Sequence, residues 1–175
     1  MKKFIMVAVM AVAALTANAQ TWAGGSFGFQ SKHVNGSESS TTLFEVSPEM
    51  GYSLSDNLDV AIALSYANIN GDQNTFAIKP YLRYSFVKEG NFAAFLDCGL
   101  GYGTTHTNGI DKNDNFFTVN INPGIAYNVS NKVTLVAHLG DGLYFSHEWK
   151  EDVKRINTFG LNFFNGVSFG AYYNF

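Results

Sequence analysis

Histidine is the residue type in this chain that most readily suggests a site, because imidazole can act as a base or bind a metal near neutral pH. His33, His106 and His147 fall in or beside long polar stretches, and three such side chains could together hold a metal ion. Histidines spread over three loops are more often simply solvated. We therefore predict no metal site and leave the role of these residues open.

The run Ser146-His147-Glu148 contains the residue types of a hydrolase with an activated serine. Such chemistry needs the serine, the histidine and the acid within hydrogen-bond reach of one another, whereas neighbours on a strand point to opposite faces. No other motif supplies a nucleophile together with its base. The sequence predicts no catalytic residue, no cofactor and no enzyme activity.

The same stretch surrounds Trp149 with charge. The charged members are Lys150, Glu151, Asp152, Lys154 and Arg155. An aromatic side chain within a polar rim can form the centre of a contact with a partner, although a solvated loop that faces lipopolysaccharide gives the same pattern. An unknown extracellular ligand at residues 31–41, 104–115 or 141–157 therefore stays open.

The N-terminus has the three parts of a secretion signal. They are the positive pair Lys2 and Lys3, an apolar run of 12 residues over 4–15, and the small-x-small cleavage site Ala17-Asn18-Ala19. The apolar run is shorter than the ~20 residues that cross a bilayer as a helix. We expect a cleaved signal peptide over 1–19 and one domain over 20–175.

The composition is unlike that of an ordinary soluble domain. Charged residues make up 14% of the chain and aromatic residues 15%, with 17 glycines, whereas soluble domains carry about 25% charge. The net charge of −3 offers no basic face to nucleic acid. No stretch after the signal reaches about 18 consecutive apolar residues, so membrane helices are excluded. An exported chain of this kind favours a β-barrel.

An internal repeat gives the number of strands. Each of the three prolines is the first residue of one copy of this repeat, and the copies cover 48–54, 80–86 and 123–129. A fourth copy, without proline, ends the chain at 169–175. Four strand ends of one kind imply four hairpins and eight antiparallel strands. Alternation with period two places the strands at 21–30, 42–54, 58–67, 75–87, 92–103, 116–129, 133–140 and 158–175.

The connections differ between the two ends of these strands. The short turns are 55–57, 88–91 and 130–132, and the long loops are 31–41, 68–74, 104–115 and 141–157. An even strand number with this asymmetry is typical of an outer-membrane barrel. We expect an all-β, eight-stranded antiparallel up-and-down transmembrane β-barrel in a Gram-negative outer membrane, with both termini on the periplasmic side.

Alternate strand positions form two faces. One face has large apolar side chains and no charge, as lipid requires, because a charge at mid-bilayer costs about 2–4 kcal/mol. The other is mostly Gly, Ala, Ser and Asn, which fits the narrow inside of a small barrel. The strand charges all fall on this inner face: Glu45, Glu49, Asp59, Lys79, Arg83 and Asp97. We expect a packed, closed lumen, with an ion path along these charges and His138 as the alternative.

Turn lengths predict which inner positions lie opposite one another. The opposed pairs are Glu49–Ala63, Ala63–Lys79, Asp59–Arg83 and Arg83–Asp97. Directly opposed Cβ atoms are about 4.5–5.5 Å apart. We therefore expect Arg83 between two aspartates, and Lys79 in reach of Glu49.

The tyrosines of the repeat are predicted to form a girdle at one membrane interface. They are Tyr52, Tyr84, Tyr127 and Tyr173. The eight residue-to-residue steps from Phe44 to Tyr52 cover about 20 Å of bilayer at ~3.3 Å per residue and a tilt of ~40°, close to the ~25 Å apolar band of such barrels. Proline on the lipid face removes a ladder donor, so we expect a bulge or weakened pairing at each copy.

Three segments resemble a known family: the signal end Ala17-Asn18-Ala19-Gln20, the hairpin PEMGYSLSDNLDV over 48–60 and the terminal FGAYYNF over 169–175. They look like the outer-membrane β-barrel domain proteins of Bacteroidetes, relatives of the OmpX and OmpA-type barrels, and the likeness covers the whole mature chain. The family implies residence in the outer membrane and no particular substrate. The end of the chain also resembles the signal read by the barrel-insertion machinery, with Phe169, Tyr173 and Phe175 in that role.

The sequence thus favours an integral outer-membrane barrel with a structural or surface-interaction role and a closed lumen. Two alternatives stay open: a small or transient pore for small solutes, and a loop-borne adhesion or ligand-binding module. The expected partners are the lipid bilayer, lipopolysaccharide and the insertion machinery, with no nucleic acid.

Overall fold

The structure is a computed structural model that describes residues 21–33, 40–109, 113–149, 155–162 and 166–175. The expected signal peptide lies outside these residues. The regular structure of the described part consists of strands. No helix there is long and apolar enough to cross a membrane.

Ten strands are present in the described part of the chain. They are β1 Thr21–His33, β2 Ser40–Ser55, β3 Leu58–Ile69, β4 Gln73–Glu89, β5 Phe92–Thr107, β6 Asn113–Ser130, β7 Val133–His138, β8 Gly142–Trp149, β9 Ile156–Asn162 and β10 Ser168–Asn174. We call the end that carries the connections 56–57, 90–91 and 131–132 the turn end, and the opposite end the loop end.

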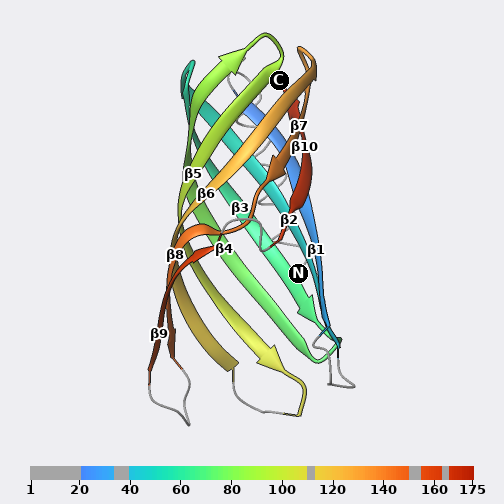
Figure 1. Ribbon diagram of the computed structural model, residues 1–175, viewed down its shortest axis with the longest axis vertical. Helices are drawn as coiled ribbons and strands as arrows, with labels where there is room; N and C mark the ends of the chain where they lie inside the picture. Colours follow the sequence, from blue (N-terminus) through green and yellow to red (C-terminus); the bar gives the residue numbers. More distant parts are fainter. Residues whose placement is uncertain (1–20, 34–39, 110–112, 150–154, 163–165) are drawn as a thin grey trace, which may run out of the picture.

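Eight of these strands close into a ring. The order is β1, β2, β3, β4, β5, β6, β7 and β10, and β10 returns to β1 from Trp22↔Asn174 to Gly28↔Ser168. Each neighbouring pair is antiparallel, and the strands are strongly tilted in Figure 1. The expected eight-stranded antiparallel barrel is therefore confirmed.

The predicted register is also confirmed at the inner charges. The opposed pairs are Glu49↔Ala63, Ala63↔Lys79, Asp59↔Arg83 and Arg83↔Asp97. The weakened pairing expected at the prolines is present: the ladder skips Ser47 and Pro48 between β2 and β3, and Lys79 and Pro80 between β4 and β5. In addition, each proline-containing copy ends in a register shift, at 53/55, 85/87 and 128/130.

The seventh spanning strand breaks opposite Pro123. The Pro123 carbonyl accepts a hydrogen bond from the Leu139 amide at 2.9 Å, but proline has no N–H to continue the ladder on that side. Gly140 and Gly142 then take φ values of 94° and 53°, which favour glycine. Beyond this break the chain resumes as β8, which pairs with β6 from Asn115 to Ile121.

The loops predicted at the loop end are too long. Residues 142–149 and 156–162 form the hairpin β8–β9 rather than part of a loop over 141–157. The segment Gly140-Asp141-Gly142 has the composition of a turn and therefore resembles the end of a strand. In the structure it only interrupts the seventh spanning strand, between β7 and β8. The loop 68–74 is likewise reduced to a tight connection between Ile69 and Gln73, while β5 and β6 extend into the range 104–115, and β1 and β2 into 31–41.

One side of the barrel wall is not closed by strand pairing towards the loop end. Beyond Gly28, β1 pairs with β2 alone among the described strands, and β9 pairs with β8 alone. In Figure 1 the β8–β9 hairpin bends away from the loop end of β1. We call this stretch, in which β1 and β9 each pair with only one described strand, the wall gap.

The outer face of the barrel is apolar. Exposed large side chains occur on every strand of the ring and on β8 and β9; they include Phe27, Phe44, Leu64, Phe76, Leu82, Leu100, Val119, Leu135, Phe145, Phe159 and Phe169. The single cysteine, Cys98, is free and exposed on this face. Such a surface suits lipid and not water.

Candidate functional site

An ion pair between neighbouring strands lies at the centre of the lumen. The Arg83 Nε and Nη2 atoms of β4 donate to Asp97 Oδ1 and Oδ2 of β5 at 2.7 and 2.8 Å. The two side chains are only 6% and 7% exposed. A bidentate pair of this kind satisfies both carboxylate oxygens and fixes the guanidinium plane.

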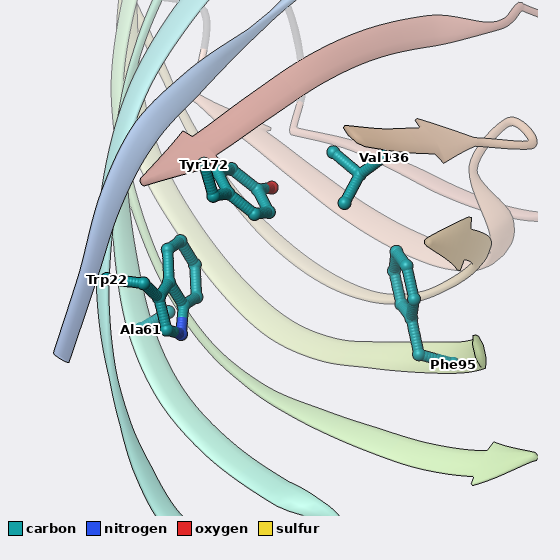
Figure 2. Close-up of a cluster of buried hydrophobic side chains, with 5 residues drawn as sticks. All are labelled: Trp22, Ala61, Phe95, Val136 and Tyr172. Atoms are coloured by element: carbon teal, nitrogen blue, oxygen red, sulfur yellow. The ribbon is translucent and has the colours of Figure 1, made fainter. Parts of the chain in front are cut away.

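Aromatic rings enclose the guanidinium of Arg83. Its carbon lies 4.0 Å from the ring centre of Phe95, 5.3 Å from that of Tyr172 and 5.5 Å from those of Trp22 and Tyr81. Contacts of this type stabilise a desolvated cation. Figure 2 shows Trp22, Tyr172, Val136 and Phe95 pointing from different strands into the barrel.

We call these residues the lumen plug: Trp22, Ala61, Arg83, Phe95, Asp97, Val136 and Tyr172, all buried. The ring centres of Trp22 and Tyr172 are 4.3 Å apart. The aromatic rings lie over glycines on neighbouring strands: a Cβ at Gly51 would be 2.3 Å from the Trp22 ring, and one at Gly124 2.3 Å from the Phe95 ring. The small inner residues thus make room for the plug.

Glu49 is buried beside the plug with hydroxyl partners. Its Oε1 accepts from Ser26 at 2.6 Å, and its Oε2 accepts from Tyr81 at 2.6 Å and from Tyr172 at 2.9 Å. The Tyr172 hydroxyl accepts in turn from Arg83 Nη2 at 3.3 Å. Tyr172 therefore connects the Arg83–Asp97 pair with Glu49.

Lys79 pairs with Glu45, whereas the sequence predicted Glu49 as its partner. The Lys79 Nζ lies 2.8 Å from Glu45 Oε1, and the two side chains are 39% and 32% exposed. Ser65 and Ser47 also donate to Glu45. Three hydroxyl groups already donate hydrogen bonds to Glu49. The flexible Lys79 side chain pairs instead with Glu45, the other inward-facing carboxylate of β2.

Asp59 does not join the central ion pair. Although it is opposed to Arg83 in the register, the described hydrogen bonds of Arg83 run to Asp97, His138 and Tyr172. The expectation of one arginine held by two aspartates is therefore wrong for Asp59. Asp97 occupies the Nε and Nη2 edge of the guanidinium with both of its oxygens, and no described hydrogen bond joins Asp59 to Arg83.

His138 links the plug to β10. Its Nε2 lies 3.1 Å from Asp97 Oδ2 and 3.2 Å from Arg83 Nη2, and its Nδ1 lies 3.3 Å from Ser168 Oγ. Serine, histidine and aspartate in this order resemble the parts of a hydrolytic site. In this structure, however, Arg83 already hydrogen-bonds to both oxygens of Asp97, the carboxylate that would have to stabilise a protonated His138. The geometry supports a structural network.

The inner charges and the residues above them line one cavity of about 260 Å³ in the half of the lumen towards the loop end. Glu45, Glu49, Lys79 and Asp97 belong to its lining, together with Asn120, Asn122 and His138. Its wall at the seventh and eighth spanning strands is formed by Gly140, Asp141, Gly166, Val167 and Ser168. The plug forms the floor on the turn-end side.

The residues predicted in loops do not gather. His106 Nδ1 lies 2.9 Å from Asn113 Oδ1, and His147 Nδ1 lies 2.5 Å from Asn157 Oδ1. No three metal-ligating side chains cluster in the part of the chain that the structure describes. Ser146, His147, Glu148 and Trp149 lie on β8, and the ring centres of His147 and Trp149 are 4.5 Å apart. His33 ends β1, while Lys150, Glu151, Asp152 and Lys154 lie outside the described residues.

The tyrosines of the repeat lie near the turn end. Tyr84, Tyr127 and Tyr173 are 51%, 52% and 43% exposed, and Tyr52 is half-buried. Lys132 Nζ lies 5.9 Å from the ring centre of Tyr173, whose ring is 5.2 Å from that of Phe175. Phe169 is exposed on the same outer face.

Several inward-facing residues of the site were not predicted from the sequence. Trp22, Phe95, Val136, Ser168 and Tyr172 occupy inner positions of their strands. Their positions along each strand were a usable signal, because each of them directly neighbours the outward-facing apolar residues in the sequence and so must point inward. Large side chains on a face of small residues could thus have been singled out as the filling of the lumen.

Comparison with known proteins identifies the family. The family model for the outer membrane protein beta-barrel domain matches residues 4–175, so the chain belongs to this family. No curated protein sequence matches the chain.

Solved structures share the fold at low sequence identity. Neisserial surface protein A has a TM-score of 0.64 at 16% identity, covering 90% of this chain and 98% of its own. The N-terminal barrel domain of Pseudomonas aeruginosa OprF has a TM-score of 0.55 at 14% identity over 89% and 98% of the two chains. Outer membrane protein W of E. coli has a TM-score of 0.52 at 13% identity over 89% and 97%. The protein is thus an outer-membrane β-barrel that resides in the lipid bilayer.

Proposed function

We propose that this member of the outer-membrane barrel family is a non-conducting, non-enzymatic barrel with a structural or surface-interaction role. The lumen plug is the observation that carries the proposal. Phe95 is 1% exposed, and Arg83 and Asp97 are each 5% exposed, so packed side chains occupy the turn-end half of the lumen. An eight-stranded barrel has room for little else.

Conductance in a planar bilayer tests this proposal. Wild-type protein should give no stable channel. The variant Trp22→Ala/Phe95→Ala should give flickering conductance, because it removes two rings from the plug, provided that heat still shifts its mobility on a gel. Leu135→Ala, on the outer face, is the matched control and should stay silent. Reproducible steps from the wild type would favour the alternative of a small or transient pore.

The orientation follows from the same proposal. Short turns and both termini belong on the periplasmic side, which leaves the loop end towards lipopolysaccharide. Tyr52, Tyr84, Tyr127 and Tyr173 then form the periplasmic girdle, with hydroxyls at the level of the head groups. Phe169, Tyr173 and Phe175 serve the barrel-insertion machinery, and residues 1–19 are removed on export. The resemblance to OmpX and OmpA-type barrels of Bacteroidetes supports this arrangement in a Gram-negative envelope.

A loop-end contact is the second candidate role. Trp149 is 41% exposed at the end of β8 and packs on His147, and exposed aromatic residues are common centres of binding. Shortening the connection between β8 and β9 should abolish adhesion to a surface if the role lies there, without changing insertion in the membrane.

A further inference from the structure

A row of polar residues crosses four neighbouring strands on the outer wall at the loop end. Asn68 of β3 is opposed to Asn74 of β4, Asn74 to His106 of β5, and His106 to Asn113 of β6. Directly opposed Cβ atoms lie about 4.5–5.5 Å apart, so the four side chains form a continuous strip, which we call the polar row. Each lies an even number of positions from an exposed apolar residue of its own strand and therefore faces outward; these residues are Leu64, Phe76, Tyr102 and Val119.

The amide groups of the first two residues have a fixed orientation. Asn68 Oδ1 accepts from the Gly71 amide at 2.9 Å, and Asn68 Nδ2 donates to Asn74 Oδ1 at 3.0 Å. The Tyr66 hydroxyl also donates to Asn74 Oδ1, at 2.8 Å. Both lone pairs of the Asn74 oxygen are thus engaged. The two N–H groups of its Nδ2 have no hydrogen-bond partner among the described residues and remain available as donors.

The His106 side chain is oriented by Asn113. Its Nδ1 lies 2.9 Å from Asn113 Oδ1, and because an amide oxygen can only accept, this nitrogen carries a proton. A second proton then binds at Nε2 and creates a cation with an N–H directed away from Asn113; imidazole changes its charge in this way between about pH 5 and 8. Both side chains are exposed. Neither His106 Nε2 nor Asn113 Nδ2 has a hydrogen-bond partner in the part of the chain that the structure describes.

No carboxylate faces the polar row from the described strands. Asp114 of β6 is opposed to Thr105, and alternation puts it on the inner face of the wall. Asp72 lies in the exposed connection beyond the ends of β3 and β4. The polar row therefore presents hydrogen-bond donors, with a positive charge at His106 at acidic pH. It suits a ligand group that consists of acceptors and carries negative charge.

The polar row begins where the apolar band ends. Ten residue-to-residue steps along β4 separate Asn74 from Tyr84, or about 25 Å of bilayer at ~3.3 Å per residue and a tilt of ~40°, which equals the ~25 Å apolar band of such barrels. Phe76, two positions nearer to the membrane centre, is 58% exposed, and the centre of its ring lies 4.9 Å from that of Tyr66. A ligand at the polar row thus also meets aromatic rings that face lipid.

We propose that the polar row binds the phosphate of a phosphorylated glycolipid in the outer leaflet, the class of lipid to which lipopolysaccharide belongs. A phosphate group offers negative charge and several strong acceptor oxygens. Asn74 Nδ2, His106 Nε2 and Asn113 Nδ2 supply the donors, and the acyl chains lie against Phe76 and Tyr102. This inference rests on the orientation in the proposed function, which turns the loop end towards lipopolysaccharide, and it names the lipid group that the barrel contacts there.

Native mass spectrometry of the intact barrel in detergent micelles measures the binding. The probes are phosphorylated lipid A, the same lipid A after enzymatic removal of its phosphate, and inorganic phosphate. At pH 6 the phosphorylated lipid should bind at least about tenfold more tightly than the dephosphorylated lipid, since one charge-assisted hydrogen bond contributes about a factor of ten or more. Inorganic phosphate should compete at least about tenfold less well than the phosphorylated lipid, because it lacks acyl chains.

Each comparison can overturn one part of the proposal. Equal binding of the two forms of lipid A would overturn recognition of the phosphate. Equal competition by inorganic phosphate would overturn the lipid as the source of that phosphate.

The contribution of His106 is tested by its pH dependence. His106→Gln should weaken binding of phosphorylated lipid A about tenfold at pH 6 and much less at pH 8, where the imidazole of the wild type is neutral. The phosphate of the lipid ionises alike with both proteins, so the difference between them reports the histidine. Asn91→Ala, at an exposed position of the turn end, is the control and should bind like the wild type. A folded His106→Gln barrel with the wild-type change in affinity between pH 6 and pH 8 would overturn the site.

A separate experiment distinguishes failure of this site from failure of the proposed function. In a Cys98→Ala background, Asp72→Cys should react with a membrane-impermeant maleimide on intact cells, because the loop end faces outward. Absence of reaction would overturn the orientation, and channel steps from the wild type would overturn the closed lumen. A reactive, silent barrel without preference for phosphorylated lipid A would overturn the polar row alone.

Discussion

Arg83 carries a permanent charge inside a membrane-spanning barrel, and several partners together make this position tolerable. The bidentate bond to Asp97 supplies the opposite charge, Tyr172 accepts a further hydrogen bond, and the Phe95 ring covers the guanidinium face. The register that opposes Arg83 and Asp97 was predictable from turn lengths. The rings of Trp22 and Tyr172 were not, because β1 and β10 are distant from β4 in the sequence.

Arg83→Ala should lower the free energy of unfolding by about 3–5 kcal/mol, because Asp97 would keep a buried charge without its partner. Urea unfolding in detergent micelles, followed by the fluorescence of the neighbouring Trp22, measures the change. Arg155→Ala, at an exposed position, should change stability by less than about 0.5 kcal/mol.

Asp59 and Asp97 provide an internal comparison for the same pair. Asp97→Asn should cost several times more stability than Asp59→Asn, since only Asp97 is among the hydrogen-bond partners of Arg83. Replacement of both members, as Arg83→Met/Asp97→Leu, should recover part of the loss. Equal losses for the two asparagine variants would contradict the assignment of Asp97 as the partner.

At the scale of the strands, glycine and aromatic positions are matched between neighbouring strands. Gly51 lies under Trp22 and Gly124 under Phe95, so small residues on one strand accept the rings of another. The alternation of small and large residues was visible in the sequence as an inner and an outer face. Each glycine is directly opposed to its ring on the neighbouring strand, Gly51 to Trp22 and Gly124 to Phe95, so the register of the hairpin decides which glycine receives which ring.

Gly124→Val should lower stability by about 1–3 kcal/mol through overpacking against the Phe95 ring. Phe95→Leu should relieve part of this loss in the double variant, since it removes the atoms that clash. Thermal unfolding followed by gel mobility reports both effects. Gly166→Ala, where an added Cβ meets open space, is the control and should change stability by no more than about 1 kcal/mol. A Gly124→Val protein as stable as the control would exclude this packing role.

At the scale of the whole molecule, the ring of eight strands leaves no free edge at the turn end, while the wall gap interrupts pairing towards the loop end. Backbone groups in lipid must be hydrogen-bonded within the protein. The closed ring therefore accounts for stability in the membrane.

Unboiled protein should migrate faster than boiled protein in SDS, because the closed ring resists the detergent at room temperature. It should also sediment with outer membranes and resist extraction by high salt. Identical mobility with and without heating, or recovery in the soluble fraction, would contradict a closed membrane barrel.

The sequence by itself determined the number of strands, their two faces and the opposed pairs of inner charges. These follow from local rules: side chains alternate along each strand, and short turns fix the register between sequence neighbours. The break at Pro123 could be anticipated as weakened pairing, but not as the point where β7 gives way to β8.

Only the tertiary structure decided the partners inside the lumen. Trp22 on β1, Phe95 on β5 and Tyr172 on β10 meet because the barrel closes, and closure sets how strands far apart in the sequence face one another across its axis. The choice of Glu45 by Lys79 depends on the same closure, since Tyr172 reaches Glu49 only when β10 returns to β1. The break between β7 and β8 also belongs to the tertiary structure, since Gly140 and Gly142 take positive φ values there that the residue type permits without requiring.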